Sequence, residues 1–157
     1  MPRWRRRSPS KADATTPADA ALEQALRALR YRDRTACEIE RFLESRGVGE
    51  SERLEVVEKL VRTALVDDRR YAESRAIALA ERGAGNERIR HELAFAGIDT
   101  EIADDVIGSL ESEAERAGRI VERRGASPKT ARYLAGKGFS DDVVHAVVAH
   151  ARDETLG

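Results

Sequence analysis

Three adjacent pairs of acidic residues are the side chains that most suggest catalysis or metal binding in this 157-residue chain. They are Asp67-Asp68, Asp104-Asp105 and Asp141-Asp142. Two carboxylates can hold a divalent cation between them, but consecutive residues of a helix point about 100° apart. Each pair also stands near an expected helix start, where a carboxylate can cap free N–H groups. We therefore interpret the pairs as caps and not as a metal-dependent nuclease site.

The histidines and the single cysteine offer no better chemistry. His145 and His150 are five residues apart on one expected helix, whereas two metal ligands on one helix face need a spacing of three or four, and His91 is remote in sequence. Cys37 has no second cysteine to pair with, which favours a reducing compartment. P-loop, dinucleotide-binding, HExxH, GxSxG and CxxC motifs are absent. We expect a protein that is not an enzyme and that uses no metal or cofactor.

Arginines are the residues best suited to bind an anionic partner, because a guanidinium pairs in two-pronged fashion with phosphate or carboxylate. The candidate set faces outward on the expected helices and comprises Arg27, Arg30, Arg34, Arg69, Arg70, Arg88 and Arg90. An ordinary solvated helix position is the alternative for each of them. The helix dipole, which favours cations at a C-terminus, also explains part of the cluster near residue 30.

The N-terminal segment, residues 1–17, contains three of the four prolines, and we expect it to be a disordered basic arm. Arg3, Trp4, Arg5, Arg6 and Arg7 are possible contacts to phosphates, with the Trp4 ring on a base. The alternative is a solubilising tail. Residues 1–11 carry a formal charge of +5, so the total of −1 leaves −6 for the other 146 residues. A general nucleic-acid-binding domain would be clearly basic.

An acidic run occupies Asp99 to Glu115, with seven acidic residues and no basic one. Acidic side chains near a helix start are favoured by the helix dipole, but this run is longer than capping requires. Two interpretations remain open. The run forms either a solvated helix face or an acidic surface that complements a basic protein partner.

Helices must position all of these residues, and the stretch from Leu65 to Asp99 shows how. Apolar residues recur there at helical spacing between Gly83 and Gly97, which end two successive helices. A glycine after a helix favours a left-handed cap, in which the next apolar residue packs on the residue four before the glycine. This signature occurs three times, in Leu43-Gly47-Val48, Leu93-Gly97-Ile98 and Leu134-Gly138-Phe139.

The glycines of this signature are 50 and 41 residues apart, which predicts three copies of one three-helix unit. We expect an all-α fold, a tandem array of three three-helix repeats that forms an elongated, curved molecule. The predicted boundaries are 18–66, 67–110 and 111–157, after the arm of residues 1–17. A repeat of roughly 40 residues would be marginal alone, so neighbouring repeats should support one another.

Details of the helices can also be predicted. The first helix should run from about Ala18 to Tyr31, with its leucines facing inward. Thr35 and Glu38 should form a capping box, and Ser51 should cap the third helix. The inward stripe of that third helix is predicted to be Leu54, Val57, Leu60, Val61 and Ala64. No apolar stretch approaches 18 residues and the basic N-terminus lacks an apolar segment, so we expect a cytoplasmic protein.

Three stretches resemble the RecX family, the regulatory proteins that restrain the bacterial recombinase RecA. They are ALRALRYRDRTACEIERFLESRG from Ala25 to Gly47, LVDDRRYA from Leu65 to Ala72, and GNERIRHELAFAGID from Gly85 to Asp99. Their order and spacing also agree with the family. Thr35 stands where the family usually has Ser, a change that keeps the cap. The third repeat matches only loosely.

The resemblance implies a monomeric, all-helical regulator of homologous recombination, DNA repair and the SOS response. Such proteins lie in the groove of the RecA–single-stranded-DNA filament and lower its ATPase, strand-exchange and co-protease activities. The expected partners are therefore the RecA filament and single-stranded DNA, bound directly or through the filament. The alternative is a direct DNA-binding protein that uses helix-turn-helix-like units and the basic arm. Acidic residues in the third helices argue against that alternative for the second and third repeats.

Overall fold

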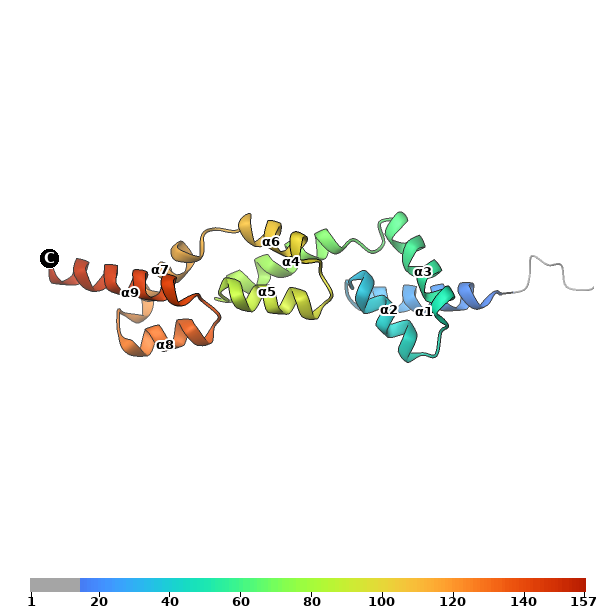
Figure 1. The fold of residues 1–157 in the computed structure, drawn as a ribbon, viewed down its shortest axis with the longest axis horizontal. Coiled ribbons are helices and arrows are strands. Elements are labelled where there is room, and N and C mark those ends of the chain that lie inside the picture. Colours follow the sequence, from blue (N-terminus) through green and yellow to red (C-terminus); the bar gives the residue numbers. More distant parts are fainter. Residues whose placement is uncertain (1–14) are drawn as a thin grey trace, which may run out of the picture. The chain divides into compact units, whose positions relative to one another are not determined.

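A computed structural model describes residues 15–157, and within that range it contains nine α-helices and no β-strand (Figure 1). The helices are α1 (Pro17–Tyr31), α2 (Ala36–Ser45), α3 (Glu50–Arg62), α4 (Asp68–Glu81), α5 (Asn86–Phe95), α6 (Thr100–Gly108), α7 (Glu113–Arg124), α8 (Pro128–Gly136) and α9 (Asp141–Leu156). The predicted all-α fold of tandem three-helix repeats is confirmed.

The chain divides into two compact units, one that ends at Val66 and one that spans Asp67–Gly157. The first unit holds the first repeat, α1–α3, and the second unit holds the second repeat, α4–α6, and the third, α7–α9. Each repeat has its own cluster of buried apolar residues. The largest buried side chains are Ile39, Leu43 and Leu60 in the first cluster, Ile89 and Leu93 in the second, and Leu134 in the third.

The helix α1 contributes alanines, not leucines, to the deepest layer of the first core. Ala21, Ala25 and Ala28 are buried, whereas the predicted leucine stripe at 22, 26 and 29 is only half-buried at the edge of the core. Small side chains let α1 lie close to α2 and α3, and the leucines then close the sides of the contact.

The predicted inward face of α3 is confirmed only in part. Leu60 is buried and Val57 packs against the core, whereas Leu54, Val61 and Ala64 are exposed. Val56 and Leu60 are its buried residues, while Leu54 and Val61 remain 53% and 51% exposed. Apolar residues cover two neighbouring faces of this helix, so their periodicity shows a wide apolar stripe but not which edge meets the core. That choice is made by the packing of α3 against both α1 and α2.

The three predicted glycine caps are confirmed. Gly47, Gly97 and Gly138 have φ values of 78°, 80° and 90°. The N–H of the residue after each glycine donates to the carbonyl of the leucine that lies four residues before that glycine. For example, the Ile98 N–H donates to Leu93 O at 3.0 Å. The same turn ends α4 at Gly83.

Helix α3 ends in this turn as well, but with Ala64 in the left-handed position at φ 57°. An L-residue with a Cβ is strained there, so Ala64→Gly should stabilise the first unit by about 0.5–1 kcal/mol, after the larger unfolded-state entropy of glycine is subtracted. Amide hydrogen exchange in the first core measures this. Gly47→Ala is the matched reverse change and should destabilise; a loss of protection in Ala64→Gly would contradict the prediction.

The N-terminal caps agree with the predictions in part. The Thr35 hydroxyl accepts the Glu38 N–H at 3.0 Å as expected, but the Glu38 carboxylate lies 2.6 Å from Arg32 Nη2. Ser51 does not cap α3, because the helix already begins at Glu50 with Gly49 as its N-cap and no side-chain cap. Helix α1 starts at Pro17, earlier than predicted, because Thr16 forms a capping box there.

Helix α5 of the second repeat is capped by the third repeat. Its N-cap, Gly85, has no side chain to accept a hydrogen bond. The Gly85 and Glu87 N–H groups instead donate to the Lys137 and Gly138 carbonyls, at 2.9 and 3.1 Å. The carbonyls that end α8 thus satisfy the N–H groups that begin α5, and the two helix dipoles meet with opposite signs.

Two side chains of α7 add to this contact between the start of α5 and the end of α8, which we call the joint. Arg116 is only 6% exposed and donates to Ala84 O at 2.6 Å, to Glu111 O at 3.0 Å and to Asn86 Oδ1. Burial lowers the pKa of Arg116. Glu113 accepts from the Asn86 N–H at 2.9 Å and from the Ser140 hydroxyl at 3.0 Å. The second and third repeats are therefore joined by polar contacts, while their apolar cores stay separate.

Candidate functional site

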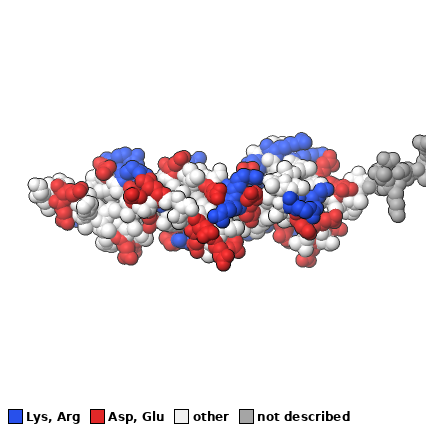
Figure 2. All heavy atoms as spheres, turned by 90° about the horizontal axis from the view of Figure 1, so that it is seen from above, with Lys and Arg blue, Asp and Glu red and all other residues white. Residues whose placement is uncertain are grey.

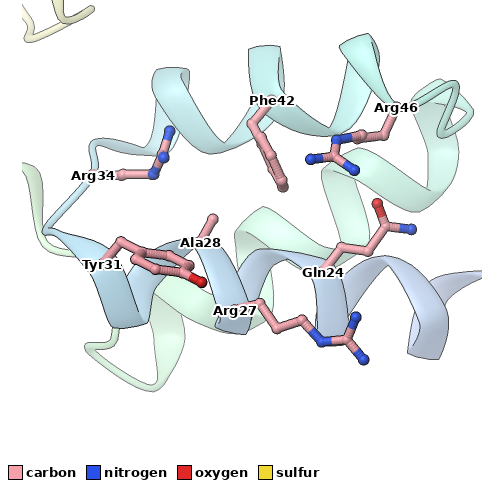
Figure 3. Close-up of a pocket in the computed structure, with 7 residues that line it drawn as sticks. All are labelled: Gln24, Arg27, Ala28, Tyr31, Arg34, Phe42 and Arg46. Carbon is pink, nitrogen blue, oxygen red and sulfur yellow. The ribbon is translucent and has the colours of Figure 1, made fainter.

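A groove on the first repeat brings three arginines and two aromatic rings together. Its volume is about 340 Å³, and α1, the turn after it and α2 form its walls (Figure 3). We call it the Phe42 groove, and its lining residues are Gln24, Arg27, Ala28, Tyr31, Arg34, Phe42 and Arg46. Arg27 and Arg34 belong to the predicted set, so the structure brings two of the seven predicted arginines into one site.

Phe42 organises the positive charge of this groove. The ring is half-buried and packs against the core of the first repeat. The guanidinium carbons of Arg34 and Arg46 lie 5.5 and 5.0 Å from its centroid, and Figure 3 shows the two guanidinium groups on either side of the ring. Attraction between a cation and the aromatic face holds both arginines beside Phe42.

The charges of Arg34 and Arg46 are not neutralised within residues 15–157. Neither side chain has a carboxylate oxygen within 4.0 Å in that range, and the buried Nε of Arg34 has no hydrogen-bond partner there. Arg27 differs, because it lies 3.7 Å from Glu23 and its guanidinium points away from Phe42 in Figure 3. The groove therefore carries two uncompensated cations on a rigid apolar support.

Tyr31 adds an exposed aromatic surface to the groove. It occupies the last position of α1 and is 88% exposed, the most exposed aromatic ring of the described chain together with Phe95 at 78%. In Figure 3 its ring lies beside Ala28, below Arg34. Ala28 and Tyr31 both line the groove.

Two predicted arginines of the second repeat, unlike Arg34 and Arg46, lie beside carboxylates. Arg69 lies 3.3 Å from Glu73 and 3.6 Å from Asp105. Arg90 lies 2.7 Å from Glu87, and a second acidic residue, Asp104, is 3.3 Å away. Such exposed pairs add little stability, but each of these arginines already has two carboxylate partners.

The other predicted contacts are not brought into a common site. Arg30, Arg70 and Arg88 are exposed, and the structure does not place them in the Phe42 groove. Arg88 lies at the joint, where its backbone approaches Gly138. The proposed arm contacts, Arg3 to Arg7 with Trp4, lie outside the described residues.

The acidic run from Asp99 to Glu115 is used mostly within the chain. Asp104 and Asp105 lie inside α6 and pair with Arg90 and Arg69, so the interpretation of that pair as a cap is wrong. The remaining members with a structural role are Asp99 and Glu115 as caps, Glu113 at the joint, and Glu111, which binds Arg119. The hydrogen bond from Arg119 lowers the pKa of Glu111.

The view in Figure 2 agrees with this neutralisation, because basic and acidic side chains are interspersed over the described face. Periodicity alone places Asp104 and Asp105 on the surface but does not show that they face α5 and α4. The packing of α6 on both helices decides that. The run therefore leaves few carboxylates free for a basic partner.

The predicted set contains Arg27 and Arg34 but lacks three further groove residues on which the site depends, namely Tyr31, Phe42 and Arg46. Arg46, the C-cap residue of α2, follows Phe42 by four residues. Because this spacing brings two side chains together at a helix end, the contact between Arg46 and Phe42 could have been predicted from the sequence. Tyr31 gave no such signal, since its exposure depends on α1 ending at that residue.

The described residues contain neither a candidate metal site nor a membrane-spanning helix. Among residues 15–157, no group of three or more His, Cys, Asp or Glu side chains could hold a metal ion. No helix in this range combines the length and the apolar character needed to cross a membrane. Cys37 is half-buried and forms no disulfide within the described residues.

Comparison with known proteins gives consistent matches. Residues 21–60 match the model of the first three-helix domain of RecX, and residues 67–107 match that of the second. The regulatory protein RecX of Trichlorobacter lovleyi is 33% identical over 143 residues, which cover 82% of this chain and 92% of that protein. The RecX protein of Mycolicibacterium vanbaalenii is 31% identical over 170 residues, with 92% of both chains covered.

A solved structure agrees with these sequence matches. The crystal structure of RecX from Lactobacillus salivarius is similar with a TM-score of 0.76 at 26% identity, covering 87% of this chain and 97% of that one. Two family models in the expected order and relatives matched over most of their length lead to one conclusion. The chain belongs to the RecX family of regulatory proteins.

Proposed function

We propose that this protein binds the RecA–single-stranded-DNA filament in the cytoplasm and lowers its ATPase, strand-exchange and co-protease activities. The observation that carries the proposal is the match to RecX regulatory proteins over 92% of a relative's length. The protein acts by binding and not by catalysis, and a monomer is sufficient for this activity.

The charge distribution of the described residues supports this function. The filament presents protein surface together with DNA phosphates, and the Phe42 groove presents two guanidinium groups that no carboxylate of residues 15–157 neutralises. In the second repeat, Arg69 and Arg90 must first leave their acidic partners before they can bind a phosphate. We therefore assign the stronger contact to the first repeat.

A RecA ATPase assay on single-stranded DNA tests the function. With the full-length protein titrated in, the rate of ATP hydrolysis should fall as the protein concentration approaches that of RecA. An unchanged rate at saturating protein, with the protein shown by circular dichroism to be folded, would contradict the proposed function.

The same assay distinguishes the two groups of arginines. Replacing Arg27, Arg30, Arg34 and Arg46 together with Gln should raise the half-inhibitory concentration at least tenfold, because charged contacts to the filament are lost. Replacing Arg69, Arg70, Arg88 and Arg90 with Gln removes the same number of charges and should have an effect several-fold smaller. Equal effects of the two sets would contradict the assignment to the first repeat.

Direct binding of DNA is the second candidate function, and the Phe42 groove favours it for the first repeat only. The later third helices carry acidic side chains that DNA phosphates would repel, among them Glu101 on α6 and Asp141 and Asp142 on α9. A recognition helix in the major groove normally presents Arg, Asn or Gln to the bases. Helix-turn-helix recognition by the second and third repeats is therefore not proposed.

A further inference from the structure

We infer that the Phe42 groove is itself a binding site for single-stranded nucleic acid, with one base stacked on Tyr31 and phosphates paired with Arg34 and Arg46. The inference deepens the proposed function and rests on it, because the proposed partner is a filament that contains single-stranded DNA. It adds a direct contact between this chain and the DNA strand. Three observations carry it, namely the free charge of the two arginines, their fixed position and the exposed ring beside them.

The guanidinium groups of Arg34 and Arg46 are available to bind an anion. Several guanidinium groups of the described chain lie beside a carboxylate, among them those of Arg69, Arg75 and Arg90. Those of Arg34 and Arg46 instead rest on Phe42, which leaves their N–H groups without a carboxylate acceptor within residues 15–157. Phosphate oxygens are the acceptors that such planar donors bind best in nucleic-acid sites.

Phe42 also lowers the entropic cost of binding. Its ring packs on the buried cluster that contains Ile39 and Leu43, so it is held by the core of the first repeat. Two arginines that contact a fixed ring lose less rotamer freedom on binding than two extended surface arginines do. The groove is thus pre-organised for phosphate.

Tyr31 determines which class of anionic partner fits. An exposed aromatic ring next to paired cations is the combination by which proteins bind single strands, because every base has a face that can stack. Bases inside a duplex are already stacked and present only their edges. An acidic peptide would use the two arginines but would gain little from the ring. The groove therefore favours an unpaired nucleic-acid strand.

The direct test measures binding of a fluorescently labelled oligothymidylate to the full-length protein without RecA, by anisotropy at several salt concentrations. Tyr31→Ala should weaken binding roughly 5- to 100-fold, the range found when one stacked base loses its aromatic partner. Tyr31→Phe keeps the ring and should bind like the unmodified protein. Since Tyr31 is 88% exposed, neither change should affect the fold.

The arginines are tested in the same assay by the salt dependence of binding. The double variant Arg34→Gln/Arg46→Gln should reduce the slope of log K against log salt by about 1.4, because each phosphate contact to a single strand contributes about 0.7. The matched control is Arg69→Gln/Arg90→Gln, which removes the same charge from arginines that are already paired, and it should leave the slope nearly unchanged.

The possible outcomes distinguish failure of the proposed nucleic-acid site from failure of the proposed function. Absence of oligonucleotide binding by the unmodified protein, or equal binding by Tyr31→Ala, overturns the site even if RecA is still inhibited. If the double arginine variant loses RecA inhibition while Tyr31→Ala keeps both activities, the groove binds an acidic protein segment and the inference is wrong. Loss of oligonucleotide binding in Tyr31→Ala, with retention in Tyr31→Phe and in the Arg69/Arg90 control, supports it.

Discussion

Replacement of Arg116 with alanine is expected to destabilise the second unit by about 3–5 kcal/mol. The side chain is almost completely buried and donates to three acceptors on two segments, Ala84 and Asn86 at the start of α5 and Glu111 before α7. Removing it leaves those acceptors in a site that water reaches poorly, and a buried polar atom without a partner loses its full hydration energy. Urea denaturation followed by circular dichroism measures the effect.

The control for this experiment is Arg119, one turn further along α7. It also forms a close ion pair, with Glu111, but both side chains are substantially exposed. Arg119→Ala should therefore cost no more than about 1 kcal/mol. Arg116→Lys should recover only part of the loss, since an ammonium group cannot reach three separated acceptors as a planar guanidinium does. Similar costs for Arg116→Ala and Arg119→Ala would show that the joint contributes little to stability.

The second large effect is expected from Gly85→Ala. A Cβ at this position would overlap the Phe139 N atom and the Gly138 carbonyl group, which are backbone atoms and cannot rotate away. The two segments must therefore move apart. As a result, the Gly85 and Glu87 N–H groups lose their hydrogen bonds to the Lys137 and Gly138 carbonyls. We expect a destabilisation of about 3 kcal/mol, at the upper end of the range for overpacking.

Gly118→Ala is the matched control for Gly85→Ala. Gly118 lies inside α7, and apart from its chain neighbours and the backbone of its own helix, no atom of the described residues lies within 4 Å of the position that a Cβ would take. Alanine should therefore stabilise α7 by about 0.5–1 kcal/mol, since it loses less backbone entropy in a helix than glycine does. Hydrogen exchange at the first amides of α5 tests the mechanism as well as the magnitude: Gly85→Ala should expose them and Gly118→Ala should not. Retained protection in Gly85→Ala would refute the role of the joint.

The joint also has a consequence for function. Because α8 caps α5, the second and third repeats should respond to a partner as one body, and loss of the third repeat would leave the start of α5 without hydrogen-bond partners. The N-cap of the second helix is Gly85 in the second repeat, whereas it is Thr35 in the first repeat and Ser127 in the third, and both of these cap with their side chains. The second repeat thus depends on its neighbour where the others cap themselves.

The sequence alone determined the local features of this protein. Helical periodicity, the left-handed preference of glycine and the hydrogen bonding of short polar caps act within about six residues, so the Gly47, Gly97 and Gly138 turns could be read directly. Their repetition then predicted three three-helix repeats. The stretches that resemble RecX lie in these same repeats, which is why the family could also be predicted.

Tertiary structure decided the features that depend on residues far apart in the chain. Whether an arginine is free or neutralised depends on which helix packs beside it, so the states of Arg34 and Arg90 could not be told apart by sequence. The acceptors of Arg116 lie up to 32 residues away, so no local pattern in the sequence indicates that this arginine is buried. Short-range preferences define the helices, but packing between them determines which charges remain available for a partner.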